Sequence, residues 1–272
     1  MPAPNARLRP WRYALASVMG TSHVKSGDPC QDAGACEVVD GPDGSDVLIA
    51  VACDGAGSAK LSQIGSAETC RFTVQRIKEL MKSGLPVVDI TQEVATRVVL
   101  EAQDNLRATA ESAGATARDL ACTLVAGIIA PDAAAFFQVG DGVAIVGQRD
   151  EPVNEFCWVF WPERGEYANT TTFLSEDRVA EHLKYDVVRR GIDEVALLTD
   201  GIQALVLDYK GHAAHAPFFS RMMAPLRARQ DAGHIGSLSS ALAVYLDSPP
   251  INDRTDDDKT LILACRRTTD DE

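Results

Sequence analysis

The segment Val47-Leu-Ile-Ala-Val-Ala-Cys-Asp54-Gly55-Ala-Gly-Ser58 is the most informative stretch of this chain. An unbroken apolar run ends abruptly at Asp54-Gly55, and a short run rich in Val and Ile that stops at Asp or Gly is typical of a β-strand. Asp-Gly is also the favoured dipeptide of type I′ hairpin turns. Here, however, Gly-Ala-Gly-Ser and then a long helical pattern follow, not a partner strand. We therefore expect Asp54 to lie at a strand end on the edge of a sheet.

Two further apolar runs end in the same dipeptide. AFFQVG is followed by Asp141-Gly142 and VALLT by Asp200-Gly201, and a fourth acidic cluster, Asp256–Asp258, precedes the apolar run TLILAC. The hairpin alternative fits Asp141 best, because strand-like residues lie on both sides of it. It fits Asp200 less well, since the residues after it do not alternate cleanly between apolar and polar.

Carboxylates at strand ends are held at a sheet edge and can converge from distant parts of the chain. Convergent carboxylates repel one another and lose hydration, and the usual resolution is a bound cation. No Cys-His set lies near these aspartates, so an all-oxygen site would select Mg²⁺ or Mn²⁺ over zinc. Two such ions a few ångströms apart would activate a bridging water and stabilise charge on a phosphoryl group. The pattern therefore favours a metal-dependent phosphatase centred on Asp54, Asp200 and Asp257.

Strands and helices are expected in separate groups along the chain. The short Val-, Ile- and aromatic-rich runs predict strands at 11–19, 34–39, 47–53, 123–129, 134–139, 144–148, 156–161, 195–199 and 260–265. Apolar residues at helical spacing predict an antiparallel helix pair over 61–81 and 90–110, and further helices over 218–228 and from Ser175 and Ser237. This order indicates an α+β fold with antiparallel sheets. We expect one domain, 11–267, between an N-terminal extension, 1–10, and a polar tail, 268–272.

The charge and the cysteines restrict the partners and the compartment. The net charge of −13, from 39 acidic and 26 basic residues, argues against nucleic acid or an anionic membrane as the main partner, although an acid excess also serves solubility alone. The seven cysteines are scattered without a C-x-x-C pair, which indicates core residues in a reducing compartment. The N-terminus lacks the apolar region of a signal peptide, and no transmembrane run is present. We expect a cytoplasmic protein.

Several stretches occur in an order that is typical of one family. They are Gly20–Ala33, which ends in Gln31-Asp32-Ala33; Val51–Ser58; Cys122–Ala126 with Val139–Gly142; Gly165–Leu174; Leu197–Gly201; and Asp257–Thr260. In these motifs the chain resembles the PP2C (PPM) metal-dependent Ser/Thr protein phosphatases, in particular their compact bacterial branch. The resemblance extends over about residues 11–266, and it implies a four-layer αββα sandwich in which helices flank two central antiparallel β-sheets.

The resemblance also implies roles for individual residues. Asp54 would bridge two Mn²⁺ or Mg²⁺ ions, with the carbonyl group of Gly55 on one of them. Asp200 and Asp257 would complete the shell of the other ion, and Asp32 would hold metal-bound water without touching a metal. Asp141, together with Asp200, matches the place where many bacterial members bind a third ion.

Three positions depart from the family pattern. The family carries a phosphate-binding Arg five residues before the Asp of the first motif, and here that position is Gly27. Lys25 or His23 would then supply the positive charge for the substrate phosphate. Eukaryotic members have a His after the Gly of the second motif, where this chain has Ala56. The family's Asp-Asn before the last strand is Asp257-Asp258 here. The run of three aspartates leaves the register open by one residue, and the spacing to Thr260 favours Asp257 as the metal ligand.

The implied activity is hydrolysis of phosphoserine and phosphothreonine in proteins by a water or hydroxide that bridges two metal ions, without a phosphoenzyme. A cognate Ser/Thr kinase is implied as a partner, and a monomer is expected. The alternative is a catalytically weak, metal-binding regulatory or scaffold protein of the same fold, which the missing phosphate-binding Arg at Gly27 favours. Retention of every candidate metal carboxylate argues against it, because an unused cluster of charges only destabilises a fold.

Overall fold

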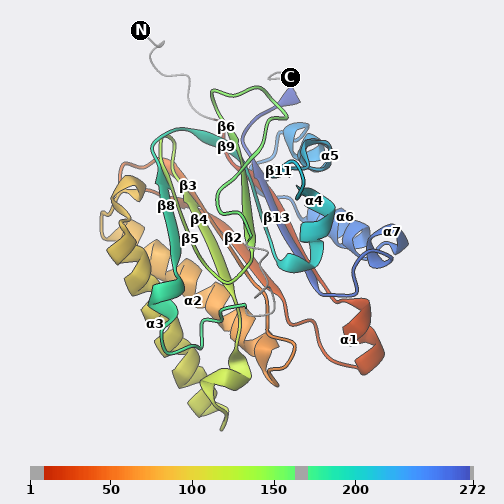
Figure 1. Cartoon of the computed structure of the whole chain (residues 1–272). Coiled ribbons are helices and arrows are strands. Elements are labelled where there is room, and N and C mark those ends of the chain that lie inside the picture. The colour runs from red at the N-terminus through yellow and green to blue at the C-terminus, as the bar shows by residue number, and fades with distance from the viewer. Residues whose placement is uncertain (1–8, 163–170, 270–272) are drawn as a thin grey trace.

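Two antiparallel β-sheets lie face to face, with helices on both outer faces (Figure 1). The structure is a computed structural model that describes residues 9–162 and 171–269. Three expected segments fall partly outside these residues, namely the N-terminal extension 1–10, the motif 165–174 and the tail 268–272. Within the described residues the chain forms the layers that the family resemblance implies, so the expected α+β fold with two antiparallel sheets is confirmed.

The first sheet has five strands, in the order β2-β3-β4-β5-β8. Their bounds are β2 Ala33–Asp40, β3 Asp46–Cys53, β4 Leu124–Ile129, β5 Ala134–Val139 and β8 Lys184–Val188. Every neighbouring pair is antiparallel. After its first residue β3 is buried along its whole length, because the second sheet covers one of its faces and helices cover the other. This double burial explains why the run from Val47 to Cys53 contains no polar residue.

The second sheet has six strands, in the order β12-β1-β13-β9-β6-β7. Their bounds are β12 Gly233–His234, β1 Arg12–Val18, β13 Lys259–Cys265, β9 Ile192–Leu198, β6 Val143–Gln148 and β7 Cys157–Trp158. All pairs are antiparallel except β1 with β12, which is parallel. A small separate ribbon pairs β10, Leu207–Asp208, with β11, Ala213–Ala214.

Long helices cover the outer face of each sheet (Figure 1). The five-stranded sheet carries α2, Ser62–Lys82, and α3, Gln92–Ser112, and the six-stranded sheet carries α5, Ala216–Arg227, and α6, Gly236–Leu246. Shorter elements are α1 Thr21–Ser26, α4 Gln203–Val206, α7 Pro249–Asn252 and the 3₁₀ turns η1 Val87–Asp89, η2 Ala117–Leu120, η3 Val179–His182 and η4 Asp200–Ile202. None of the helices among the described residues is long and apolar enough to cross a membrane.

Three apolar clusters fill the three interfaces between the four layers. Alternation along a strand sends successive side chains to opposite faces, so Phe137 packs with Leu106 under the helices while Phe136 packs with Leu197 between the sheets. Each sheet is therefore fixed on both faces. The positions of its strand ends, where the aspartates lie, follow from this packing.

Most of the expected elements are confirmed, with ends that differ by a few residues. The expected strand at 156–161 shortens to the two residues of β7, and β8 and the short helix α1 were not expected. The helix expected from Ser175 is wrong. The side-chain amide of Gln103 in α3 donates to the carbonyl oxygens of Leu174 and Glu176, which holds this segment against α3. The chain instead forms turns and then the 3₁₀ turn η3.

The hairpin interpretation of Asp141-Gly142 is also wrong. The strand before it, β5, belongs to the five-stranded sheet, whereas the strand after it, β6, pairs with β9 in the other sheet. Asp141 therefore lies where the chain crosses from one sheet to the other. A crossover between sheets and a hairpin have the same local sequence signature, namely Asp-Gly between two apolar runs, so the sequence pattern did not separate them.

Truncation of the buried Leu106 tests the packing of α3 on the five-stranded sheet. Leu106 is fully buried, whereas Leu100 of the same helix is 40% exposed. Leu106→Ala should lower the free energy of unfolding by about 3 kcal/mol, because it removes buried apolar contacts and leaves a cavity. Leu100→Ala should change it by less than about 1 kcal/mol. Urea denaturation measures both, and equal effects of the two substitutions would contradict this packing.

Candidate metal centre

The strand register brings the candidate aspartates to one edge of the sandwich. Strands β3 and β5 both run antiparallel to β4, so they end on the same side, where Asp54 and Asp141 follow them. In the other sheet β9 ends where β6 begins, with Leu198 opposite Val143, which places Asp200 beside Asp141. The antiparallel pairing of β13 with β9 puts the start of β13, and thus Asp257, at this edge as well.

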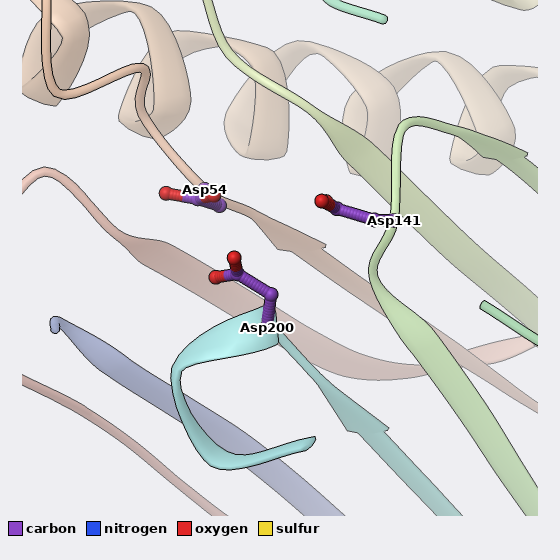
Figure 2. A group of neighbouring side chains, drawn as sticks. All are labelled: Asp54, Asp141 and Asp200. Atoms are coloured by element: carbon purple, nitrogen blue, oxygen red, sulfur yellow. The ribbon is translucent and has the colours of Figure 1, made fainter. Parts of the chain in front are cut away.

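The carboxylates of Asp54, Asp141 and Asp200 converge (Figure 2). One ligand oxygen from each lies within 4.8 Å of those of the other two, and each residue is half-buried. The three residues come from three chain segments and from both sheets. This is the arrangement that the sequence predicted for Asp54 and Asp200, and it includes Asp141, which the local pattern had left open to a hairpin turn.

Reciprocal backbone contacts fix Asp54. Its backbone N–H donates to the hydroxyl group of Thr123 at 3.0 Å, and the N–H of Thr123 donates to the carbonyl oxygen of Asp54 at 2.7 Å. The next residue, Gly55, forms an isolated bridge with Cys122. A Cβ atom on Gly55 would lie only 2.6 Å from the carbonyl oxygen of Gln31, so glycine is required where these two segments pass each other.

Asp141 presents an oxygen without a partner. The hydroxyl group of Thr171 donates to its Oδ2 atom at 2.8 Å. Its Oδ1 atom is buried and accepts no hydrogen bond from the residues that the structure describes. A buried carboxylate oxygen without a donor is unfavourable unless a cation lies beside it. This orphaned oxygen is an independent indication that the cluster binds a metal ion.

Asp32 lies next to the cluster, just before β2, and is only 8% exposed. Its Oδ2 atom accepts a hydrogen bond of 2.7 Å from the hydroxyl group of Thr199. Thr199 in turn accepts from the backbone N–H of Thr260 at 3.0 Å. The carboxyl group of Asp32 is therefore held in one orientation by the segment that also carries Asp200.

The two aspartates before β13 have different surroundings. Asp258 is 2% exposed, and its carboxylate accepts hydrogen bonds from the backbone N–H groups of Gly20 and Gln31 and contacts Nδ1 of His23 at 2.9 Å. Asp257 is exposed, and its Oδ1 atom accepts from the N–H of Asp258 at 2.8 Å. Because the first-motif segment occupies the carboxylate of Asp258, Asp257 is the residue of this pair that is free to approach a metal.

The first motif supplies little positive charge toward the cluster. His23, in α1, contacts Asp258, and Lys25 is exposed. Gly27 ends α1 in the left-handed conformation, with φ of 81° and its N–H on the carbonyl oxygen of His23. A residue with a β-carbon, including an Arg, would be strained in this conformation of the loop.

Burial and mutual repulsion raise the pKa values of the clustered carboxyl groups. Burial, with the charges of Asp32, Asp200 and Asp257 adding to it, raises the pKa of Asp54 well above its usual range. Burial and the charge of Asp141 raise the pKa of Asp200 to about 7. Burial likewise raises the pKa of Asp32 to about 7, although the hydrogen bond from Thr199 opposes the rise. Desolvation by neighbouring atoms raises the pKa of Asp257 as well, although this residue is more exposed than the other three.

These groups fit a hard divalent cation. The ligand atoms that converge are carboxylate oxygens, which is the ligand chemistry that Mg²⁺ and Mn²⁺ prefer. Perturbed, mutually repelling carboxyl groups around an orphaned oxygen are also typical of a functional site. Among the described residues no other group of three His, Cys, Asp or Glu side chains is close enough to share an ion.

Comparisons with known proteins show the family to which this chain belongs. The model of the protein phosphatase 2C family matches residues 19–247. The chain is also 33% identical to serine/threonine-protein phosphatase 3 of Escherichia coli (strain K12) over 254 residues, which cover 93% of this chain and 98% of that protein. The chain therefore belongs to the protein phosphatase 2C family, and the expected family is confirmed.

Solved structures share the fold at low sequence identity. The serine/threonine phosphatase Stp1 from Staphylococcus aureus aligns with a TM-score of 0.59 at 15% identity, over 97% of this chain and 99% of that chain. RsbX in complex with magnesium aligns with a TM-score of 0.53 at 14% identity, over 97% of each chain. These likenesses support the four-layer architecture.

Sequence reasoning missed the neutral residues that hold the carboxylates. Thr123 and Thr199 lie inside the motifs Cys122–Ala126 and Leu197–Gly201, just before β4 and just before Asp200, but a Thr at a strand end is too common to be given a role from sequence alone. Gln203, whose side-chain amide donates to the backbone carbonyl oxygen of Asp141, lies in a stretch that carries no recognisable signal. Only the tertiary contacts identify these residues.

The raised pKa values predict how stability depends on pH without metal. In the folded state Asp32 and Asp200 keep protons up to about pH 7, whereas the unfolded chain releases them near pH 4. Stability of the EDTA-treated protein should therefore fall as the pH rises through 7, with a melting temperature about 5 °C lower at pH 8 than at pH 5.5.

Mn²⁺ should reverse this trend, because it binds the ionised carboxylates. Its stabilising effect should be larger at pH 8 than at pH 5.5, and Asp200→Asn should flatten the metal-free dependence. Differential scanning calorimetry measures each case. A metal-free melting temperature that rises between pH 5.5 and 8 would contradict the repulsion described above.

Proposed function

We propose that this chain is a metal-dependent protein phosphatase that hydrolyses phosphoserine and phosphothreonine in proteins. The observation that carries the proposal is the convergence of Asp54, Asp141 and Asp200 at one sheet edge, with an oxygen of Asp141 left without a partner. Membership of the protein phosphatase 2C family and the relation to an E. coli serine/threonine-protein phosphatase support it.

The proposed cofactors are two Mn²⁺ or Mg²⁺ ions, with a third near Asp141 and Asp200. When bound, the ions would supply Lewis acidity and positive charge for the phosphoryl group. Asp54 and the Gly55 carbonyl group would hold them on one side, and Asp200 and Asp257 on the other. The reciprocal contacts with Thr123 would keep Asp54 in place, so that little reorganisation accompanies binding.

We assign Asp32 to the water that attacks phosphorus. Its carboxyl group is oriented by the hydroxyl group of Thr199, so it is able to accept a hydrogen bond from a water molecule and to take up a proton. It lies beside Asp54 but outside the group of three convergent carboxylates, which suits a residue that holds water instead of metal.

Fewer residues are available to bind the phosphate group of the substrate than to bind the metal ions. With Gly27 at the position of the family's Arg, we propose that Lys25, exposed on α1, meets the phosphoprotein. His23 has its Nδ1 atom on Asp258 and would contribute charge from a fixed position. We further propose a monomeric, cytoplasmic enzyme that opposes a Ser/Thr kinase, which agrees with seven free cysteines and a net charge of −13.

A phosphatase assay tests the proposal. Purified protein should hydrolyse p-nitrophenyl phosphate and a phosphothreonine peptide with Mn²⁺ and lose this activity in EDTA. Asp54→Asn should reduce kcat/KM about a hundredfold or more, because it removes the charge of the central ligand. The matched control is Asp46→Asn, which alters an exposed carboxylate at the opposite end of the same strand and should leave the rate unchanged.

Two outcomes would contradict the enzyme. Turnover that is absent with every divalent metal would favour the alternative of a metal-binding regulatory or scaffold protein, to which the missing Arg at Gly27 points. Full activity in Asp54→Asn would show that the catalytic centre lies elsewhere.

A further inference from the structure

A single side-chain amide joins the two acidic turns on either side of the metal centre. Gln203 begins α4, three residues after Asp200, and is 9% exposed. Its Nε2 atom donates to the backbone carbonyl oxygen of Asp141. This hydrogen bond therefore joins two segments. One is the segment after β9, which carries Asp200, and the other is the turn between β5 and β6, which carries Asp141.

Tyr209 sets the orientation of this amide. Its hydroxyl group donates to Oε1 of Gln203 at 3.1 Å. An amide has one donor end and one acceptor end, so this bond directs the NH₂ group of Gln203 to Asp141. The rings of Tyr209 and Trp161 pack edge to face, with their centroids 5.6 Å apart. The ring of Trp161 in turn stacks on that of His212, with a centroid distance of 4.1 Å. An aromatic cluster therefore fixes the hydroxyl group that orients Gln203.

Hydrogen bonds constrain two successive carbonyl groups of this turn, those of Gly140 and Asp141. Gly140 has φ of 97°, and its carbonyl oxygen accepts from the side-chain amide of Gln138 at 2.8 Å. Gln138 lies in β5, directly before this turn, so that bond shapes the turn without attaching it to Asp200. Gln203 is the glutamine that holds the turn against the opposite segment.

A tie of this kind has a physical purpose. Asp141 and Asp200 carry like charges in a half-buried site, and the charge of Asp141 contributes to the raised pKa of Asp200. Without a cation the two turns would move apart to relieve this repulsion. A hydrogen bond to the backbone that keeps the two turns together holds the carboxylates at the spacing that a divalent ion requires, before the ion binds. Loss of hydrogen bonds that orient metal ligands typically lowers metal affinity by about 10–100-fold.

We propose that Gln203 and Tyr209 are positioning residues that fix the spacing between Asp141 and Asp200 and so set the affinity of this part of the centre for a divalent cation. The inference rests on the proposed function only in taking the three carboxylates as metal ligands. Neither residue is assigned to touch the ion or the substrate.

Direct Mn²⁺ binding tests the inference. Free Mn²⁺ would be measured by electron paramagnetic resonance during titration of the purified, EDTA-treated full chain, for the wild type and for the variants Tyr209→Phe and Gln203→Met. Tyr209→Phe should weaken at least one Mn²⁺ site about threefold to tenfold, and Gln203→Met about tenfold or more. The metal-free melting temperature would be measured alongside and should fall by only a few degrees.

Two controls separate positioning from general destabilisation. Tyr185→Phe removes a hydroxyl group that donates to the carbonyl oxygen of Ile90, on the helical side of the five-stranded sheet, and should leave Mn²⁺ affinity unchanged. In an Asp141→Asn background, Tyr209→Phe should cause no further loss of affinity, because the ligand that it positions is already removed.

The possible results are distinct. Wild-type Mn²⁺ affinity in both Tyr209→Phe and Gln203→Met would overturn the inference, as would an equal loss of affinity in Tyr185→Phe or in the Asp141→Asn background. Mn²⁺ binding by the wild type without phosphatase turnover would overturn the proposed activity while the binding comparison still decides the positioning role. Absence of Mn²⁺ binding by the wild type would overturn both.

Discussion

Repulsion among carboxylates that share one edge of a sandwich is the constraint on which this structure depends. Asp54, Asp141 and Asp200 lie within ligand distance of one another, and burial raises the pKa values of Asp54 and Asp200. Such a cluster opposes folding. Hydrogen bonds with neutral residues hold the backbone of its members: Asp54 exchanges two with Thr123, and the carbonyl oxygen of Asp141 accepts one from Gln203. The sandwich thus supports a cluster of carboxyl groups whose mutual repulsion is relieved by protonation at low pH and by a bound cation at higher pH.

The four-layer architecture explains how this support arises. Strands such as β3 are buried on both faces, so polar groups are excluded from their middles and gather at their ends. The antiparallel register then brings the ends of β3, β5 and β9 and the start of β13 to the same edge. Helices pack on the outer faces and hold the strands of both sheets in position. The clustered aspartates are therefore distant in sequence because each follows or precedes a different strand.

The sequence predicted the parts of this structure that local chemistry decides. The apolar run before Asp54 specified a buried strand, and the helical spacing specified α2 and α3. The prediction failed where the outcome depends on distant partners: the Asp-Gly at Asp141 is a crossover between sheets, and the segment after Ser175 forms turns that hydrogen bonds from Gln103 hold against α3. The site was incomplete for the same reason, since the roles of Thr199 and Gln203 exist only in the folded chain.

The most direct test of the metal centre is a crystal structure of the Mn²⁺-bound protein with anomalous diffraction data at the manganese edge. We expect anomalous peaks between the carboxylate of Asp54 and those of Asp200 and Asp141, about 2.1–2.2 Å from their oxygen atoms, with Asp257 and not Asp258 in contact with an ion. Anomalous density at other residues, or an Asp54 carboxylate that touches no ion, would contradict this account.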